Sequence, residues 1–542
     1  MLKRSSILGL FLLTASVASC FSQINIANYQ VIPLPEYIVT SKGKSFQLEE
    51  LTTISYPAHN MELKRNAQLL SDYIKEATGM SLRISSAKKI NQTIILKIDT
   101  RLKNKEGYEL IVTEKTITIS GLTGAGVFYG IQTLRKSIPQ GKTNTSILMP
   151  PVQIEDYPRF EYRGAHLDVG RHFFPVSFIK RYIDILALHN VNNFHWHLTE
   201  DQGWRIEIKR YPNLTRVGSR RTETVVGHSN DKFDGISYDG FYTQKQIKEV
   251  VAYAKKRYIN IIPEIDMPGH MLAALASYPE LGCTGGPYEV GKKWGIFDDV
   301  LCVGNENTIR FIENVLSEIM QLFPSKYIHI GGDECPKVRW KTCDKCQTRI
   351  KSEKIESDGK HSVEQCLQSN FISGVEKFLN SKGRVIIGWD EILEGGLAPN
   401  ATVMSWRGIN GGIEASKQKH NVIMTPTDYC YFDNYQCVNI ENEPIAQQGF
   451  LPVEKVYSYD PIPAELTKDE RQYILGVQSN LWTEYIKTSQ QAEYMLLPRL
   501  AALSEVQWTM PERKNYQSFL KRIPQLVNIY NAKKYNYAKH IL

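Results

Sequence analysis

The 542-residue sequence lacks features that define several classes of protein. No apolar run inside the chain is long enough to cross a membrane, so we do not expect an integral helical membrane protein. Lysine and arginine are dispersed among acidic residues without basic blocks, although the formal charge is +8, and nucleic acid is therefore not an expected partner. The 42% apolar and 23% charged residues are typical of a globular protein, and the length predicts two or three domains.

A nucleotide-binding loop is also missing. The glycine-rich segment Gly121–Gly126 does not match the dinucleotide fingerprint, and it lacks the Lys-Ser/Thr pair of a phosphate loop. We interpret it as the start of a helix and expect no cofactor.

Cysteine is scarce, with nine residues in the chain. Cys283 and Cys302 flank a segment that contains glycine and proline, and they are a candidate disulfide pair. Cys343-Asp-Lys-Cys346 has the spacing of a metal knuckle, with Cys335 and Cys366 as candidate partners, but a second Cys-x-x-Cys pair is absent. We therefore expect a disulfide or free thiols and no metal site, with a structural Zn²⁺ as the less favoured alternative.

The N-terminus reads as an export signal over residues 1–19. Lys3 and Arg4 precede the apolar run Ile7–Leu13, and small residues follow it. Val17–Cys20 resembles a bacterial lipobox, which predicts lipidation of Cys20 and a periplasmic, outer-membrane or cell-surface lipoprotein. Cleavage nearby to give a freely soluble product is the alternative. Contact with a membrane is expected only through this anchor.

Two patterns divide the rest of the chain. Residues 20–155 read as a small α+β domain, with strand-like runs such as Tyr108–Val112 and a helical repeat over Asn66–Ala77. From residue 156 to about 510, apolar strands alternate with helical patterns, which predicts an α/β fold with a (β/α)₈ TIM barrel. We expect residues 511–542 to form a helical tail that packs on the barrel. The eight candidate strands are Tyr162–Val169, Asn193–Leu198, Tyr258–Ile265, Lys326–Ile330, Arg384–Gly388, Thr402–Ser405, Val422–Thr425 and Ile474–Asn480.

The fourth candidate strand ends in two glycines and two acids, Gly331-Gly332-Asp333-Glu334. Glycines allow a tight turn and a close approach of a ligand, and adjacent carboxylates raise each other's proton affinity. A solvated surface turn is the alternative interpretation. Polar and aromatic residues also follow each of the seven remaining candidate strands. In a barrel these strand ends meet at the face where barrel enzymes bind substrate. Asp333 and Glu334 are therefore candidates for acid/base catalysis.

Tryptophans and hydrogen-bonding groups at the strand ends suit a sugar. Trp389, Trp406 and Trp482 either belong to the core or form an apolar box around a sugar ring. Arg171, Asp433 and Glu484 could hold hydroxyl groups, although a structural salt bridge is the alternative for Arg171. Both imidazoles of His195-Trp196-His197 share one face, where hydrogen bonding is favoured over metal ligation. His270 is expected to hydrogen-bond and tune a carboxylate.

Together these motifs resemble those of glycoside hydrolase family 20, the β-N-acetylhexosaminidases. The resemblance covers nearly all of the chain after the leader. Its carriers are Arg163–Asp168, Arg171–Phe173, His195–Trp204, Met267–His270, His329–Glu334, Gly388–Glu391, Ser405–Gly408, Tyr431–Asp433 and Leu481–Glu484.

The resemblance implies an exo-acting enzyme that removes terminal GlcNAc or GalNAc with retention, using the substrate's own acetamido group as nucleophile. Glu334 would be the acid/base, while Asp333 and Tyr431 would orient the acetamido group. The tryptophans would enclose the sugar, Arg171 and Glu484 would hold the 3- and 4-hydroxyls, and Asp433 the 6-hydroxyl. The alternatives are a lacto-N-biosidase-type activity, a glycan-binding lipoprotein without activity and a metal-dependent hydrolase.

One position departs from the family pattern. Two aspartates commonly follow the His-Trp-His strand, but the first acid here is Glu200 and the second is Asp201. Either could pair with His270, and we place all three in the substrate site. The loops at Val225–Tyr242 and Glu441–Leu466 are expected to decide the choice of glycan.

Overall fold

The N-terminal part of the chain forms a sheet covered on one face by helices. The computed structural model describes residues 25–87, 91–141 and 146–541, so the expected leader and Cys20 lie outside the described residues. Seven strands pair in the order β1-β9-β6-β7-β5-β3-β4. Their bounds are β1 Tyr37–Thr40, β3 Thr53–Ser55, β4 Arg83–Ser85, β5 Thr93–Ile98, β6 Tyr108–Val112, β7 Thr116–Gly121 and β9 Val152–Asp156.

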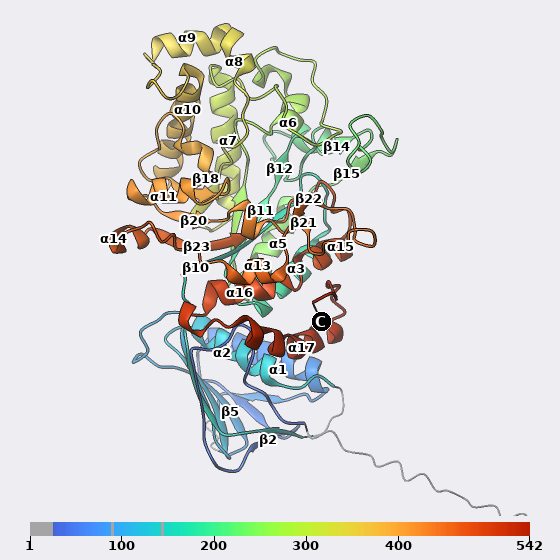
Figure 1. Cartoon of the computed structure of the whole chain (residues 1–542), viewed down its shortest axis with the longest axis vertical. Coiled ribbons are helices and arrows are strands. Elements are labelled where there is room, and N and C mark those ends of the chain that lie inside the picture. Colours follow the sequence, from blue (N-terminus) through green and yellow to red (C-terminus); the bar gives the residue numbers. More distant parts are fainter. Residues whose placement is uncertain (1–24, 88–90, 142–145, 542) are drawn as a thin grey trace, which may run out of the picture.

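Helices α1 (Met61–Thr78) and α2 (Gly124–Ser137) lie between this sheet and the rest of the molecule (Figure 1). In α1, an apolar residue recurs every three or four positions and is buried, which gives the helix one face toward the sheet. The Asn60 side chain accepts a hydrogen bond from a free amide at its start. The glycine-rich segment begins α2, as predicted, and Thr123 is the N-cap of this helix.

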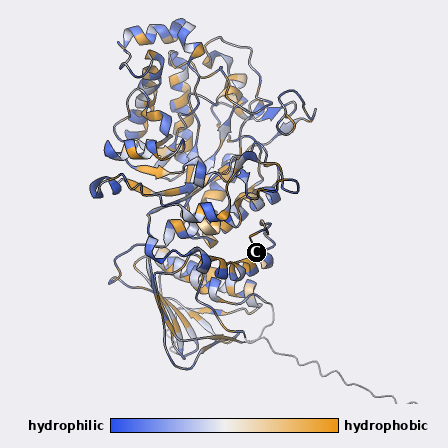
Figure 2. Ribbon diagram, in the orientation of Figure 1, coloured by the Kyte–Doolittle hydropathy of each residue, from blue (hydrophilic) through white to orange (hydrophobic). Residues whose placement is uncertain are grey.

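The second part is a closed barrel of eight parallel strands, which confirms the predicted fold class. Each candidate strand is present within about two residues of its predicted bounds. The strands are β10 Tyr162–Asp168, β11 Asn193–His197, β16 Asn260–Glu264, β17 Tyr327–His329, β18 Val385–Trp389, β19 Thr402–Ser405, β20 Val422–Met424 and β23 Ile474–Ser479. Figure 2 shows the hydrophobic residues concentrated on strands and on the inner faces of helices.

Helices surround most of the barrel. Between β18 and β19 the chain makes only the short 3₁₀ helix η2 (Asp390–Leu393), so this repeat lacks the helix that the pattern predicts. The other connections carry α3 Val176–Leu188, α4 Asn213–Arg216, α5 Gln244–Lys255, α6 Leu272–Ser277, η1 Pro279–Leu281, α7 Glu306–Leu322, α8 Val338–Thr342, α9 Asp344–Ser352, α10 Val363–Asn380, α11 Asn410–Lys417, α12 Thr427–Cys430, α13 Val453–Ser458, α14 Lys468–Arg471, α15 Ser489–Leu496 and α16 Arg499–Trp508. Short strands in the loops are β12 Thr199–Glu200, β13 Gly203–Trp204, β14 Arg220–Arg221, β15 Tyr238–Asp239, β21 Asn434–Tyr435 and β22 Gln447–Phe450, and β2 Phe46–Leu48 pairs with β8 Ile147–Met149.

The C-terminal helix α17 (Tyr516–Ala532) contacts both domains, not the barrel alone. Arg522 pairs with Glu505 of α16 and also donates to the Val31 carbonyl oxygen at 2.9 Å. Gln525 donates to the carbonyl oxygens of Asn28 (2.8 Å) and Lys136 (2.7 Å), both in the N-terminal domain. The predicted tail is therefore a wedge between the domains, visible beside α1 and α2 in Figure 1.

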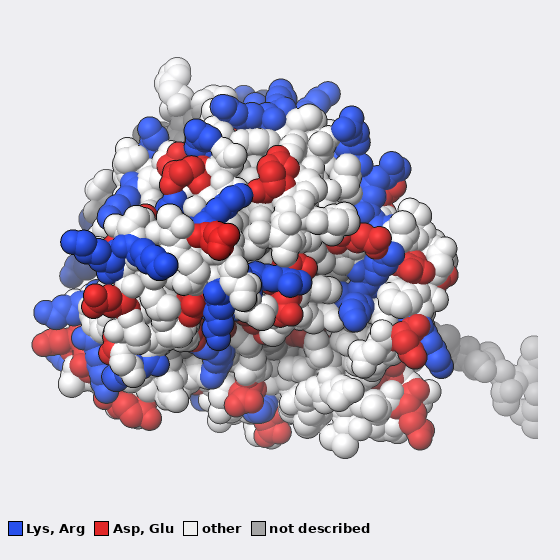
Figure 3. Space-filling model, turned by 90° about the horizontal axis from the view of Figure 1, so that it is seen from above, with Lys and Arg blue, Asp and Glu red and all other residues white. Residues whose placement is uncertain are grey.

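Charges of both signs are interspersed on the face drawn in Figure 3. Among the helices of the described residues, none combines the length and the apolar character needed to span a bilayer.

Candidate active site

The carboxyl ends of the barrel strands surround a cavity of about 390 Å³. Nine of the predicted site residues line it, which fits the expectation that strand ends converge at one face. They are Arg171, Asp333, Glu334, Trp389, Trp406, Tyr431, Asp433, Trp482 and Glu484.

The turn after β17 directs both acids to this cavity. The strand ends at His329, and Gly331 and Gly332 follow with φ of 69° and 98°, where a side chain is strained. A Cβ at Gly331 would also overlap the Asp266 carboxylate. Glu334 itself has φ of 44°. Because the pair lies beyond the strand, its side chains do not alternate between opposite faces as a strand would require.

His270 joins the acidic pair to a buried network. Its Nε2 atom lies 3.4 Å from a Glu334 carboxylate oxygen and 3.7 Å from one of Asp333. On the other side, its Nδ1 atom is 2.8 Å from Glu200 and 3.0 Å from Asp201. Both acids after the His-Trp-His strand therefore contact His270, but they differ in their other partners. Asp201 accepts the backbone N–H of Leu272 at 2.9 Å, which holds the His270 loop, whereas Glu200 lies 3.2 Å from Arg171.

The surroundings separate the proton affinities of the two acids. Burial raises the pKa of Asp333 to about 7, against the attraction of His270 and with help from the charges of Glu264 and Glu334. The hydrogen bond from His270 lowers the pKa of Glu334 despite its partial burial. Burial opposes protonation of His270, but the carboxylate of Glu200 leads the interactions that raise its pKa well above the ordinary value. The free site thus holds an imidazolium, an ionised Glu334 and a proton on Asp333 below pH 7.

Three tryptophans line the cavity, and two of them donate hydrogen bonds to acidic side chains. Trp389 Nε1 donates to Glu264 at 2.9 Å, and Trp406 Nε1 donates to Glu391 at 2.9 Å. Trp482 lies against Trp389, with ring centroids 5.7 Å apart, and under the Arg171 guanidinium. These contacts hold three indoles rigidly around one space, as a binding box for a sugar requires.

Glu264 is a buried hub below the pocket. His195 Nε2 and His329 Nδ1 each lie 2.9 Å from its oxygens, and His197 Nδ1 lies 2.5 Å away. The two imidazoles of the His-Trp-His strand thus do point to one partner, and they contact a carboxylate that also orients Trp389. Glu264 lies near the end of the third candidate strand, Tyr258–Ile265, but no role was predicted for it because its partners come from three different strands.

Several cavity-lining groups have buried polar atoms without a hydrogen-bond partner among the described residues. Arg171 Nε, Asp333 Oδ1, Asp433 Oδ1 and Glu484 Oε2 are all in this state. An unpaired buried polar atom costs about 1–3 kcal/mol, so such atoms concentrated in one pocket indicate a polar ligand. Burial also raises the pKa of Asp433, to about 8, with the Glu484 charge adding to the effect.

Some predicted site residues do not line the cavity, and some residues that line it were not predicted. Glu200, Asp201 and His270, which we placed in the substrate site, do not line the cavity; His270 contacts the Glu334 carboxylate, and Glu200 contacts Arg171. Of the two loops expected to decide the substrate, the one at residues 441–466 contributes and the one at 225–242 does not. Lining residues that the sequence did not single out are Thr427, Asn434, Gln447, Gln448 and Gly449.

The predicted disulfide is not present. Cys283 and Cys302 are not bonded to each other. Each has a sulfur neighbour from a different part of the chain, Cys346 at 3.9 Å from Cys283 and Cys343 at 3.6 Å from Cys302. The prediction was wrong because it considered only cysteines close in sequence, whereas the loop folds against α9.

An eight-stranded barrel with this acidic and tryptophan-lined pocket defines the class of carbohydrate-active barrel proteins. Two family models match the chain: glycosyl hydrolase family 20, domain 2, over residues 28–157, and glycosyl hydrolase family 20, catalytic domain, over residues 160–511. The chain belongs to glycosyl hydrolase family 20.

Relatives and solved structures agree with this assignment. A β-hexosaminidase of Porphyromonas gingivalis is 45% identical over 92% of this chain, and the match spans 64% of that protein. The exo-β-N-acetylglucosaminidase of Vibrio harveyi, solved with N-acetylglucosamine, has a TM-score of 0.83 at 30% identity, covering 95% of this chain and 79% of that one. The β-N-acetylhexosaminidase of Streptomyces coelicolor gives 0.80 at 28%, covering 94% and 97%. The chain thus spans a little under two thirds of the length of the Porphyromonas relative.

Proposed function

We propose that this protein is an exo-acting β-N-acetylhexosaminidase that hydrolyses terminal, non-reducing GlcNAc or GalNAc by substrate-assisted catalysis with retention. The observation that carries the proposal is the pocket itself, in which adjacent carboxylates, three fixed indoles and unpaired polar atoms surround a space of about 390 Å³. Support also comes from the relatives, one named a β-hexosaminidase and one solved with N-acetylglucosamine.

The first step breaks the glycosidic bond. Glu334 donates its proton to the glycosidic oxygen, and the acetamido carbonyl oxygen forms a bond to the anomeric carbon as the leaving group departs. The resulting oxazolinium ring is positively charged. Asp333 accepts the acetamido N–H and stabilises this charge, and Tyr431 donates its hydroxyl hydrogen to the carbonyl oxygen and orients it.

The second step restores the site. Glu334, now ionised, removes a proton from water, and the water oxygen attacks the anomeric carbon and opens the oxazolinium ring. Two displacements at the same carbon leave the anomeric configuration unchanged. Every atom is supplied by the substrate, water and these three side chains, so the step needs no cofactor.

Substrate binding redistributes the proton held by the pair. In the free site the proton is on Asp333 and Glu334 is ionised. The acetamido N–H stabilises the charged form of Asp333 and lowers its pKa, while the bound sugar excludes water from Glu334 and raises its pKa. The two shifts move the proton to Glu334, which is the form that the first step requires.

We expect the protein to hydrolyse aryl β-GlcNAc and β-GalNAc, with kcat/KM for aryl β-glucoside at least about 10³-fold lower. The glucoside lacks the acetamido group, and a positioned intramolecular nucleophile contributes a large rate factor. Steady-state kinetics with the three substrates, with NMR of the first-formed anomer, would check this. Comparable rates on the glucoside would contradict the substrate-assisted route, release of a disaccharide would point to lacto-N-biosidase activity, and an inert protein would leave only sugar binding.

The pH dependence of kcat/KM should be bell-shaped. The reactive pair carries one proton, so activity falls above pH of about 7, where Asp333 loses that proton in the free enzyme. It falls again in acid, below the lowered pKa of Glu334, where a second proton binds.

His270→Gln tests the cause of that profile. It removes a cation that lowers both pKa values, so both limbs should move to higher pH. His361→Gln, a change at a partly exposed histidine that pairs with Asp358 outside the pocket, is the matched control and should leave the profile in place. A profile that does not move in His270→Gln would refute the role given to its charge.

A further inference from the structure

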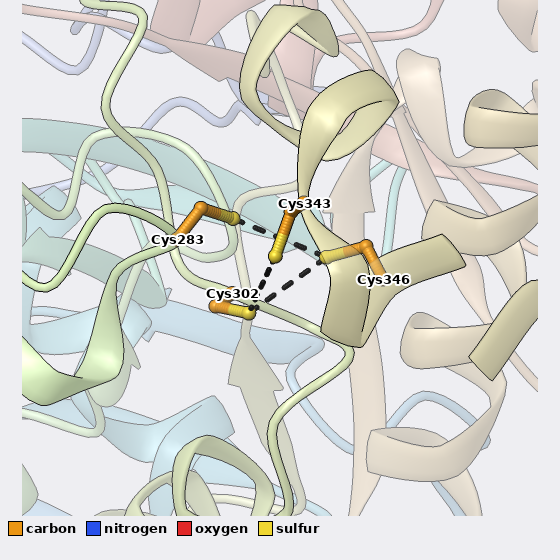
Figure 4. A group of neighbouring side chains, drawn as sticks. All are labelled: Cys283, Cys302, Cys343 and Cys346. Atoms are coloured by element: carbon orange, nitrogen blue, oxygen red, sulfur yellow. Dashed lines mark hydrogen bonds between the residues drawn. The ribbon is translucent and has the colours of Figure 1, made fainter. Parts of the chain in front are cut away.

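Four cysteines from two separate segments converge beside the barrel. Cys283 and Cys302 belong to the long loop between β16 and α7, and Cys343 and Cys346 lie at the start of α9 (Figure 4). One ligand atom from each lies within 4.8 Å of all the others. Cys335 and Cys366, the partners considered from the sequence, are not part of this group.

The spacing of the sulfur atoms fits one tetrahedral ion. The Cys302 sulfur is 3.6 Å from that of Cys343 and 3.7 Å from that of Cys346, and the Cys283 and Cys346 sulfurs are 3.9 Å apart. Zn–S bonds of about 2.3 Å in a regular tetrahedron give sulfur–sulfur edges of about 3.8 Å. A disulfide needs about 2.05 Å instead.

The surroundings suit thiolates. Cys302, Cys343 and Cys346 are buried, and Cys283 is partly exposed. Cys346 is in the first turn of α9, where the positive end of the helix dipole stabilises a negative sulfur. Gly304 packs so closely on this turn that a Cβ there would overlap the backbone of Lys345 and Cys346, which keeps the Cys302 loop against the helix.

We propose that these four cysteines bind a structural Zn²⁺ ion. Four thiolates in a tetrahedron select zinc or iron over hard cations, and a closed site with four protein ligands leaves no position for substrate. The site is distinct from the active-site pocket, because none of its residues lines the cavity.

The proposed ion would crosslink two loops that carry active-site residues. Cys283 and Cys302 follow His270 in the loop after β16, while Cys343 and Cys346 follow Glu334 in the loop after β17. An ion bound by all four therefore ties together the two loops that carry the acid/base pair and its histidine. Both loops contain only short helices (α6, η1 and α8) before the cysteines, and a metal crosslink that closes long connections contributes to their order.

The experiment is metal analysis of the full chain, exported by a bacterial host and purified without chelator, reductant or added metal. We expect about one zinc per chain in the wild type, close to none in Cys302→Ser and Cys346→Ser, and about one in the control Cys366→Ser, which removes a buried cysteine outside the group. Replacement of zinc by Co²⁺ in the wild type should give the thiolate-to-cobalt charge-transfer bands of a tetrahedral four-sulfur site.

The wild-type measurements do not depend on the folding of any variant. Mass spectrometry of the unreduced protein that finds disulfides among the four cysteines, with no zinc, would overturn the proposal. Iron at one equivalent, or four thiols that are alkylated in the native protein without release of metal, would overturn it as well. Each of these results can be obtained whether or not the protein hydrolyses glycosides.

Discussion

Glu334→Gln is expected to lower kcat by about 10²–10⁴-fold on substrates whose leaving group must be protonated. Glutamine keeps the shape of the side chain but supplies no proton. An aryl glycoside with a dinitrophenolate leaving group needs no protonation, so its first step should be nearly unaffected. The dependence of kcat/KM on the pKa of the leaving phenol, measured for a series of aryl β-GlcNAc substrates, should become steep in the variant.

The fold should tolerate this change, because the Glu334 side chain is 34% exposed at the pocket. Glu249→Gln is the matched control and should retain full activity. It alters an exposed acid on α5 that pairs with Lys180 of α3. Thermal unfolding should show similar midpoints for all three proteins. An equal loss on every leaving group would assign Glu334 to binding or positioning instead of proton transfer.

Asp333→Asn is expected to lower kcat by about 10²–10³-fold, the effect of removing one preorganised electrostatic contact with a charge that develops in the transition state. The loss should persist with the dinitrophenyl substrate, in contrast to that of Glu334→Gln, because the oxazolinium charge forms with any leaving group. The variant should also lose affinity for a cationic bicyclic analogue of the oxazolinium ring by a larger factor than for GlcNAc. Isothermal titration with the two ligands measures this difference.

The fall of kcat/KM at high pH gives a second measurement of the role of Asp333. Asp333 is the group whose pKa of about 7 limits activity in base, so Asn should remove or displace that fall. Asp72→Asn, a change at an exposed acid on α1, is a control that should preserve both kcat and the profile. Equal losses of affinity for the cation and for GlcNAc would mean that Asp333 orients the substrate without stabilising charge.

Much of the architecture could be predicted from the chain alone. Short apolar runs that end in charged or aromatic residues marked all eight barrel strands, because a strand buried on both faces has few other patterns available. The nine residues that line the cavity and were predicted lie at such a strand end or in the segment that follows it. Local sequence was informative there because the barrel brings every carboxyl end to one face.

Features that depend on contacts between distant segments were less accessible. Glu264 contacts histidines from two other strands, and His270 contacts two acids from one loop and two from another. Gln447 and Gly449 reach the pocket from a loop whose path has no periodic signal. The group of four cysteines was not predicted for the same reason. Cys302 and Cys343 are 41 residues apart in the sequence, and only the folded chain brings them together.

Because α17 is the last helix in the chain, the contacts that it makes with both domains form late in folding. The N-terminal domain and the barrel strands all precede it in the chain, and domains generally fold as they emerge during synthesis. Until residues 516–532 are made, the apolar faces that receive Phe519, Ile523 and Leu526 stay open, and Glu505 lacks its arginine. The contacts between the domains that run through α17 therefore form last, after the pocket residues have been made. A chain cut before α17 would keep the direct contacts of Arg163 with Glu106 and of Tyr258 with Glu62 but would lack this second connection.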